Sequence, residues 1–174
     1  MGYTGLLFWV TTRQTRVHWQ RVGYWFTLGG LLVVHSLAFV CILRAYPIES
    51  NFPMALDESD NRLLVATRVP PQLVVFDTTS GRLVAALPSV QDSDDLYYDS
   101  ARKRVYVSGG EGYISVFQQR DPDHYSLLAK VQSGLGGRTS GYFGKGRKGF
   151  DRYYVVVPTR AGHDAEVLIY TLQD

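Results

Sequence analysis

The chain from residue 52 onward consists of short apolar or alternating segments separated by turn residues. The first group of segments is Met54–Leu56, Leu63–Thr67, Leu73–Phe76 and Leu83–Leu87. Runs of this length that are rich in β-branched, aromatic and leucine side chains are typical of β-strands. Polar turn formers separate them, and Gly81 can take a positive φ without steric cost. The pattern therefore predicts strands joined by tight turns.

This pattern occurs twice more along the chain. Asp57 and Arg62 recur as Asp99 and Arg104, each 42 residues later. Periods of about 40–50 residues with four short strands apiece are typical of β-propeller blades. The further predicted strands are Leu96–Tyr98, Val105–Ser108, Tyr113–Phe117, Tyr125–Val131, Thr139–Phe143, Tyr153–Pro158 and Glu166–Leu172.

One long apolar segment, Val22–Leu43, precedes these repeats and contains 22 residues without a formal charge. About 20 apolar residues in a helix span the hydrocarbon core of a bilayer. Tyr24 and Trp25 at one end and Tyr46 beyond the other are placed as interfacial aromatic residues. A cleaved signal peptide would have a shorter apolar core and an A-x-A-like site, which residues 44–46 do not provide. A buried soluble helix is the other alternative, but a propeller has no interior place for one. We predict a transmembrane helix.

The predicted fold class is all-β: a partial β-propeller of about three blades, preceded by one N-terminal transmembrane α-helix. The predicted N-terminal tail is 1–21, the transmembrane helix 22–43 and the linker 44–51. The partial propeller is 52–174, with blades at about 52–92, 93–136 and 137–174. The last blade lacks a fourth strand.

Charge is distributed unevenly between these regions. Residues 1–44 contain Arg13, Arg16, Arg21 and Arg44 and no acidic residue, whereas the remaining residues carry 14 basic and 16 acidic side chains. The positive charge before the helix predicts a cytoplasmic tail and places the propeller part in the periplasm or outside the cell. The nearly neutral remainder gives no reason to expect a nucleic-acid-binding surface.

Four motifs carry a resemblance to a known family: PMALDESDNRLLV, LVVFDTTSGRLV, DDLYYDSARKRVYVSGGEGYISVF and EVLIYTL. They resemble the YVTN-type β-propeller repeats, which occur mostly in exported bacterial proteins, and the resemblance covers 52–174. It implies that this region corresponds to the C-terminal blades of a propeller. It does not imply one activity, because propellers include binding modules, lactonases and redox enzymes.

The chain departs from that family in blade number. Members usually carry about seven blades, and their N-terminus commonly supplies the last strand of the ring. Three blades cannot close a ring, so apolar faces and strand edges would be exposed. Three explanations remain open: two chains assemble into one ring, the chain is a truncated or rearranged gene product, or a partner protein covers an open array.

The candidate binding residues lie where the innermost strands are expected to begin. These positions are Phe52-Pro53, Asp94-Asp95 and Arg138-Thr139-Ser140. In a propeller they would face the mouth of the central channel. The predicted ligand site therefore comprises Asp94, Asp95, Arg138, Thr139 and Ser140, and its ligand would be a cation, a sugar or a polar peptide. In the alternative interpretation, the two aspartates cap the start of a strand and Arg138 screens their charge.

Other motifs predict no catalytic residues, no metal site and no cofactor. Residues 92–95 lack the glycine and glutamate of a calcium-binding EF-hand loop, and the glycine-rich residues 144–149 precede a predicted strand instead of a helix. His124 and His163 lie in separate loops, and Cys41 is the only cysteine.

These observations favour a membrane-anchored, non-catalytic module that binds a ligand or a protein. One alternative is a lactonase- or quinoprotein-like enzyme that other blades or chains complete. Another is a truncated, non-functional remnant. The expected partners are the membrane, through residues 22–43, and a second copy or another protein that completes the propeller.

Overall fold

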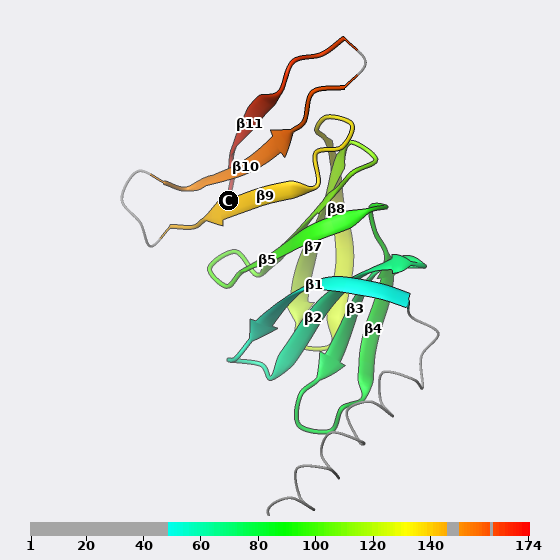
Figure 1. Cartoon of the computed structure of the whole chain (residues 1–174). Coiled ribbons are helices and arrows are strands. Elements are labelled where there is room, and N and C mark those ends of the chain that lie inside the picture. Colours follow the sequence, from blue (N-terminus) through cyan, green and yellow to red (C-terminus); the bar gives the residue numbers. More distant parts are fainter. Residues whose placement is uncertain (1–48, 146–149, 161) are drawn as a thin grey trace, which may run out of the picture. The chain divides into compact units, whose positions relative to one another are not determined.

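The computed structural model describes residues 49–145, 150–160 and 162–174, which form eleven β-strands (Figure 1). The predicted tail 1–21 and transmembrane helix 22–43 lie outside the described residues. In the ranges that are described, no helix is long and apolar enough to cross a membrane. The strands are β1 (Glu49–Asp57), β2 (Arg62–Val69), β3 (Pro71–Asp77), β4 (Leu83–Pro88), β5 (Ser93–Asp99), β6 (Arg104–Gly109), β7 (Tyr113–Asp121), β8 (His124–Gln132), β9 (Thr139–Phe143), β10 (Arg152–Val157) and β11 (Glu166–Thr171).

The strands form three antiparallel sheets in chain order. Blade 1 has the order β1-β2-β3-β4, blade 2 has β5-β6-β7-β8, and blade 3 has β9-β10-β11 (Figure 1). The first strand of each blade contacts the first strand of the next, β1 with β5 and β5 with β9. This arrangement is propeller-like, and it confirms the all-β class with successive antiparallel sheets. Among the described residues, blade 3 contains three strands.

The pairing register shows that blades 1 and 2 repeat the same hairpin. Asp57 pairs with Arg62 across the first turn of blade 1, and Asp99 pairs with Arg104 across the first turn of blade 2. The residue before each arginine, Asn61 or Lys103, has a φ of 54°. The spacing of 42 residues seen in the sequence therefore corresponds to equivalent structural positions.

A first hydrophobic core lies between blades 1 and 2. Alternation along a strand sends successive side chains to opposite faces, so one face of β2 and β3 can point towards blade 2. The buried members of this core are Leu64, Ala66, Leu73, Val75, Val90, Leu96, Val105, Val107 and Phe117. Because each sheet alone would leave these side chains in water, packing of the two faces stabilises both sheets.

A second core joins blades 2 and 3, and it is rich in tyrosine. Its buried members are Tyr106, Ile114, Val116, Tyr153, Val155 and Val157. The rings of Tyr106 and Tyr153 lie 5.4 Å apart between centroids, and Tyr106 stacks on Tyr142 at 5.7 Å. Blade 2 therefore has one face in each core, which makes it the central element of the array.

We expect substitution of Leu73 by alanine to destabilise blades 1 and 2 by about 2–5 kcal/mol, because it leaves a cavity in the first core. The matched control is Leu128→Ala on β8, where the side chain is 52% exposed and the cost should stay below about 0.5 kcal/mol. Denaturant unfolding of the full chain in detergent, followed by circular dichroism, measures both. Equal effects of the two substitutions would contradict the assignment of this core.

Candidate functional site

The structure brings Arg138 and Asp94 of the predicted site into direct contact. Arg138 Nε lies 2.9 Å from Asp94 Oδ2, and Arg138 Nη1 lies 2.8 Å from Asp92 Oδ2. Arg68, at the end of β2, approaches the same two carboxylates: its Nη1 lies 3.3 Å from Asp92 Oδ1, and its Nη2 contacts Asp94 Oδ1. We call Arg68, Asp92, Asp94 and Arg138 the Arg–Asp network. It connects all three blades at the starts of their inner strands.

The geometry of this network determines what it can do chemically. Each carboxylate contacts both guanidinium groups, and the four side chains are 24–43% exposed. Two arginines and two aspartates sum to zero charge, and a cation bound by the carboxylates would displace the arginines and leave them close together. No group of three or more His, Cys, Asp or Glu side chains in the described ranges is arranged to hold a metal ion.

The remaining predicted residues contribute to the junction between blades 2 and 3. Ser140 N donates to Asp95 Oδ2 over 2.6 Å, and Ser140 Oγ lies 2.9 Å from both Ser108 Oγ and Tyr153 OH. Thr139 begins β9 and is exposed. The five predicted residues therefore lie at the starts of neighbouring inner strands, and ligand binding by them stays a prediction.

Sequence reasoning missed Arg68, which is central to the Arg–Asp network. Besides its ion pairs, Arg68 Nε donates to the carbonyl oxygen of Ser93 over 3.0 Å. Arg68 is separated by 24 residues or more from the acids it contacts. No local motif marks such a contact, which depends on how blade 1 packs on blade 2.

A buried polar cluster lies at the opposite end of the junction between blades 1 and 2. Asp57 is 2% exposed and accepts hydrogen bonds from Ser59 Oγ at 2.6 Å, Tyr98 OH at 2.9 Å and Gln119 Nε2 at 3.1 Å. Burial alone would raise the pKa of Asp57. The three hydrogen bonds and the positive charge of Lys103 outweigh it and lower this pKa to about 2. The carboxylate is therefore held ionised as a structural acceptor.

The pKa of Tyr98 in this cluster is shifted in the opposite direction from that of Asp57. Burial raises the pKa of the Tyr98 hydroxyl, and its hydrogen bond to Asp57 raises it further. The hydroxyl therefore stays protonated and donates to the carboxylate. A tyrosine with a raised pKa is a poor general base, so this cluster does not have the properties of a catalytic acid–base pair.

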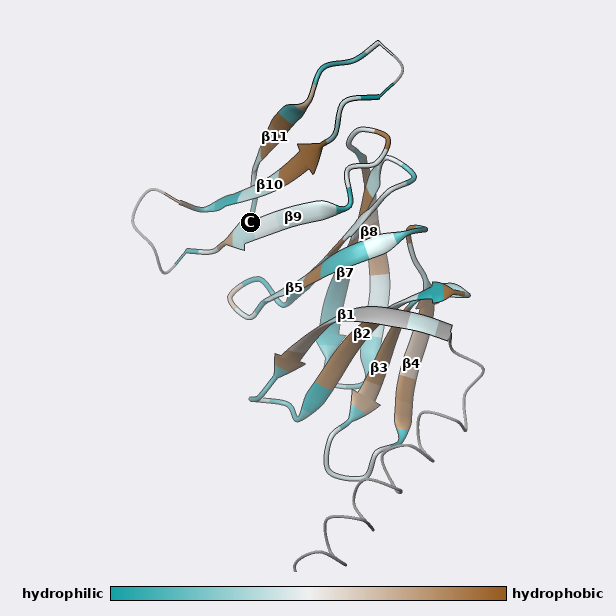
Figure 2. Ribbon diagram, viewed as in Figure 1, coloured by the Kyte–Doolittle hydropathy of each residue, from teal (hydrophilic) through white to brown (hydrophobic). Residues whose placement is uncertain are grey.

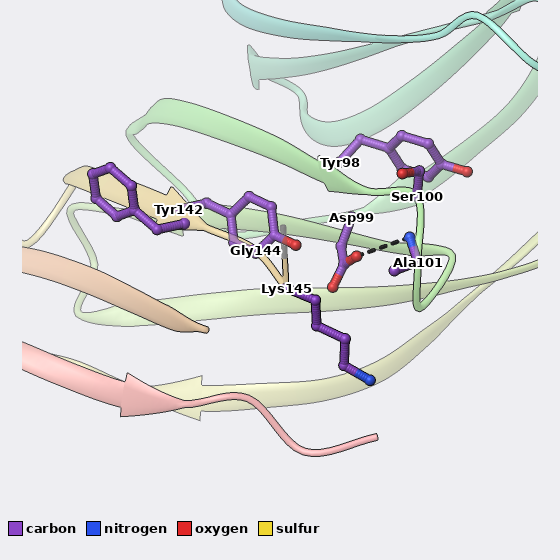
Figure 3. A pocket seen from close by; sticks show the side chains of 8 residues that line it. Tyr98, Asp99, Ser100, Ala101, Tyr142, Gly144 and Lys145 are labelled. Atoms are coloured by element: carbon purple, nitrogen blue, oxygen red, sulfur yellow. Dashed lines mark hydrogen bonds between the residues drawn. The ribbon is translucent and has the colours of Figure 1, made fainter. Parts of the chain in front are cut away.

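A pocket of about 460 Å³ lies between the first turn of blade 2 and the end of β9 (Figure 3). Its lining residues are Tyr98, Asp99, Ser100, Ala101, Tyr142, Phe143, Gly144 and Lys145. Asp99 Oδ1 accepts from Ala101 N over 3.0 Å, as the dashed line in Figure 3 shows. This hydrogen bond belongs to the turn itself.

The charged groups of this pocket are also paired. Arg102 is 4% exposed in its side chain, and its Nη1 donates to Asp99 Oδ2 over 2.9 Å. Its Nη2 contacts Asp151 of blade 3 at 2.5 Å. Lys145 contacts Asp174. An ion-pair network beside the pocket therefore connects blades 2 and 3, and Asp99, the carboxylate that lines the pocket, has a cationic partner.

The solved structures that are similar to this chain include the following two. The β-propeller domain of Cps50 (Swd1) from Myceliophteria thermophila is 14% identical with a TM-score of 0.48, and the match covers 70% of this chain and 43% of that one. A functionally unknown protein from Desulfotomaculum acetoxidans is 11% identical with a TM-score of 0.30, and the match covers 62% and 49%. The chain spans less than half the length of either structure.

No family model matches the sequence, and no curated protein matches it. The resemblance to YVTN-type repeats therefore stays a prediction. The propeller-like arrangement itself follows from the strand order, the repeated register and the contacts between inner strands.

We expect Asp57→Asn to reduce stability at neutral pH and to flatten its loss in acid. The pKa of Asp57 is lowered in the folded chain, so its contribution is present above a pH of about 4 and is lost as the pH falls towards 2. A shift of this size corresponds to about 2 kcal/mol. The measurement is denaturant unfolding at several pH values, with the exposed Asp164→Asn as control. An acid-induced loss as steep in Asp57→Asn as in the wild type would contradict the role of Asp57.

Proposed function

We propose that this chain is a membrane-anchored, non-catalytic binding module of the propeller type. In this proposal residues 22–43 form the anchor, and the blades lie in the periplasm or outside the cell. The motifs that resemble YVTN-type repeats support the same assignment. The binding partner is a protein, and the chain acts by presenting a sheet surface to it.

The observation that carries this proposal is an exposed apolar face on blade 3. Val156 of β10 is 45% exposed, and Val167 and Ile169 of β11 are 56% and 62% exposed. Phe143 and Phe150 extend the surface, with ring centroids 6.4 Å apart. Figure 2 shows the apolar stretch of β10 and its continuation on β11. Exposed clusters of aliphatic and aromatic side chains mark protein-interaction sites.

The polar residues support binding over catalysis. The acids of the Arg–Asp network contact two arginines each, and Asp99 contacts Arg102. The contacts of the Arg–Asp network connect neighbouring blades, and no nucleophile lies beside a base among these residues. The ligand site predicted at Asp94, Asp95, Arg138, Thr139 and Ser140 would have to compete with these contacts. A protein partner at the apolar face needs no such rearrangement.

Thiol labelling tests the proposed interaction in the cell. In a Cys41→Ser background, which removes the only native thiol, Val167→Cys should react slowly with a maleimide in intact cells and rapidly in the purified chain. The matched control is Leu127→Cys on β8, which is 51% exposed against 56% for Val167. It should react at similar rates in both settings. Equal reactivity of Val167→Cys in cells and after purification would contradict the proposed function.

The same control variant tests the proposed orientation. With a maleimide that does not cross the inner membrane, Leu127→Cys should be labelled in intact cells without detergent, because the positively charged tail keeps the blades outside the cytoplasm. Labelling only after the membrane is dissolved would place the blades in the cytoplasm. That result would overturn the proposed location of the blades, but it would not affect the proposal that the exposed face of blade 3 binds a protein.

A further inference from the structure

The three blades share a set of four positions on the face that points towards the next blade. We call this face the front face. Its four positions in each blade are two residue pairs between the second and the third strand. In blade 1, Leu64 pairs with Val75 and Ala66 pairs with Leu73. The equivalent pairs are Tyr106 with Val116 and Ser108 with Ile114 in blade 2, and Tyr154 with Ile169 and Val156 with Val167 in blade 3.

Burial at these positions differs sharply between the blades. All four are buried in blade 1, at 0% exposure, and in blade 2, at 0–8%. In blade 3, Val156, Val167 and Ile169 are 45–62% exposed, although their side chains are as apolar as those of the other two blades. Each buried front face lies against the following blade, in the first or the second core. The front face of blade 3 therefore has the composition of a blade interface.

An arginine series leads to the same conclusion independently. The second strand of each blade begins with an arginine: Arg62, Arg104 and Arg152. Arg62 reaches past the third strand of blade 2, where its Nε donates to Pro122 O at 3.0 Å and its Nη2 to Asp123 Oδ1 at 2.6 Å. Arg104 likewise reaches past the third strand of blade 3, where Nη1 donates to the carbonyl oxygen of Gln173 over 2.5 Å.

Arg152 occupies the third position of this series. Arg152 Nη1 donates a hydrogen bond to Asp151 O at 2.9 Å, which is the carbonyl oxygen of the preceding residue. Arg62 and Arg104 donate to groups that follow the third strand of the next blade. At the equivalent position, the Arg152 guanidinium can donate to a carbonyl or carboxylate oxygen after the third strand of another sheet. Arg152 and the apolar front face of blade 3 therefore both indicate that the partner is another β-sheet.

We propose that the front face of blade 3 binds an antiparallel β-sheet supplied by a different polypeptide, with Arg152 contacting an acidic or carbonyl-bearing turn of that sheet. This inference rests on the proposed function and names the partner of the same surface. The partner sheet presents alternating Val, Leu and aromatic side chains, as blade 2 does towards blade 1 with Leu96, Val105, Val107 and Phe117.

A second copy of this chain fits the surface less well. Two front faces related by a two-fold axis would bring together Tyr154, Val156, Val167 and Ile169 from each copy, with no acid among them to receive Arg152.

A defined probe for this proposal is the full chain extended at Asp174 by a flexible linker and a second copy of residues 93–132. A linker of about a dozen Gly and Ser residues allows the added blade to reach the front face. The added blade carries the apolar face that packs on blade 1 and the turn that receives Arg62. In the Cys41→Ser background, we expect the extension to slow maleimide labelling of Val167→Cys roughly ten-fold or more, because labelling then requires local opening.

Two variants make this experiment specific. Arg152→Gln should raise the labelling rate of the extended chain roughly ten-fold, the loss expected for a charge-assisted hydrogen bond. Arg120→Gln, at an exposed position of β7, should leave the rate unchanged. Introducing Val107→Asp into the added copy alone should abolish protection. Unchanged labelling of Val167→Cys with an added blade that circular dichroism shows to be folded would overturn the proposal.

A cross-linking experiment on the unextended chain covers the case in which the added blade does not fold. A benzophenone amino acid placed at Val167 in intact cells should form an adduct with a β-sheet segment of another polypeptide, and the same group at Leu127 should not. An adduct joining two copies of this chain, or one formed with a helix or with lipid, would overturn the proposal. Protection of Val167→Cys in cells together with an adduct to a helix of another protein or to a second copy would leave the proposed binding function standing with a different protein partner.

Discussion

Packing of one sheet face on the next is the interaction on which the rest of this structure depends. A sheet of short strands has two faces, and each must lose contact with water for the sheet to be stable. Blade 2 satisfies this condition on both sides, with Val105 and Phe117 in the first core and Tyr106 and Val116 in the second. Blades 1 and 3 therefore depend on blade 2 far more than on each other.

Polar interactions align these packed faces at both ends of each junction. The Arg–Asp network connects the starts of the inner strands, while Asp57, Tyr98 and Gln119 form hydrogen bonds at the opposite end of the first junction. Exposed ion pairs contribute little stability individually. Buried acceptors such as Asp57 are different, since an unpaired carboxylate there would be costly. Among the described residues, these two polar clusters connect neighbouring blades.

The distribution of apolar surface then relates the fold to a function. Blade 3 repeats the front-face composition of its neighbours, yet Val156, Val167 and Ile169 on that face are exposed. Its β11 edge is the outer edge of a three-stranded sheet among the described residues. A surface of this kind is a liability for a soluble domain unless a partner covers it. The proposed binding of another protein would cover this surface without a change in the polar network.

Several features of the fold could be predicted from the sequence, because they depend on local chemistry. Alternating apolar residues and turn formers located the strands, and the recurrence of Asp57 and Arg62 as Asp99 and Arg104 gave the repeat that the pairing register confirms. β1 nevertheless begins at Glu49, within the residues assigned to a linker, because pairing with Val69 extends it beyond the apolar pattern. Strand pairing of this kind leaves little signal in composition.

The sequence by itself determined the strand-forming segments, the repeat and the placement of Asp94, Asp95, Arg138 and Ser140 at strand starts. Only the tertiary structure decided what those residues contact. Arg68 joins the network from another blade, and Asp95 accepts a hydrogen bond from the backbone amide of Ser140. Likewise, Val75 and Ile169 are equivalent in the repeat, but one is buried and the other exposed. The difference depends on whether another sheet lies against that face, and neighbours distant in the chain determine this.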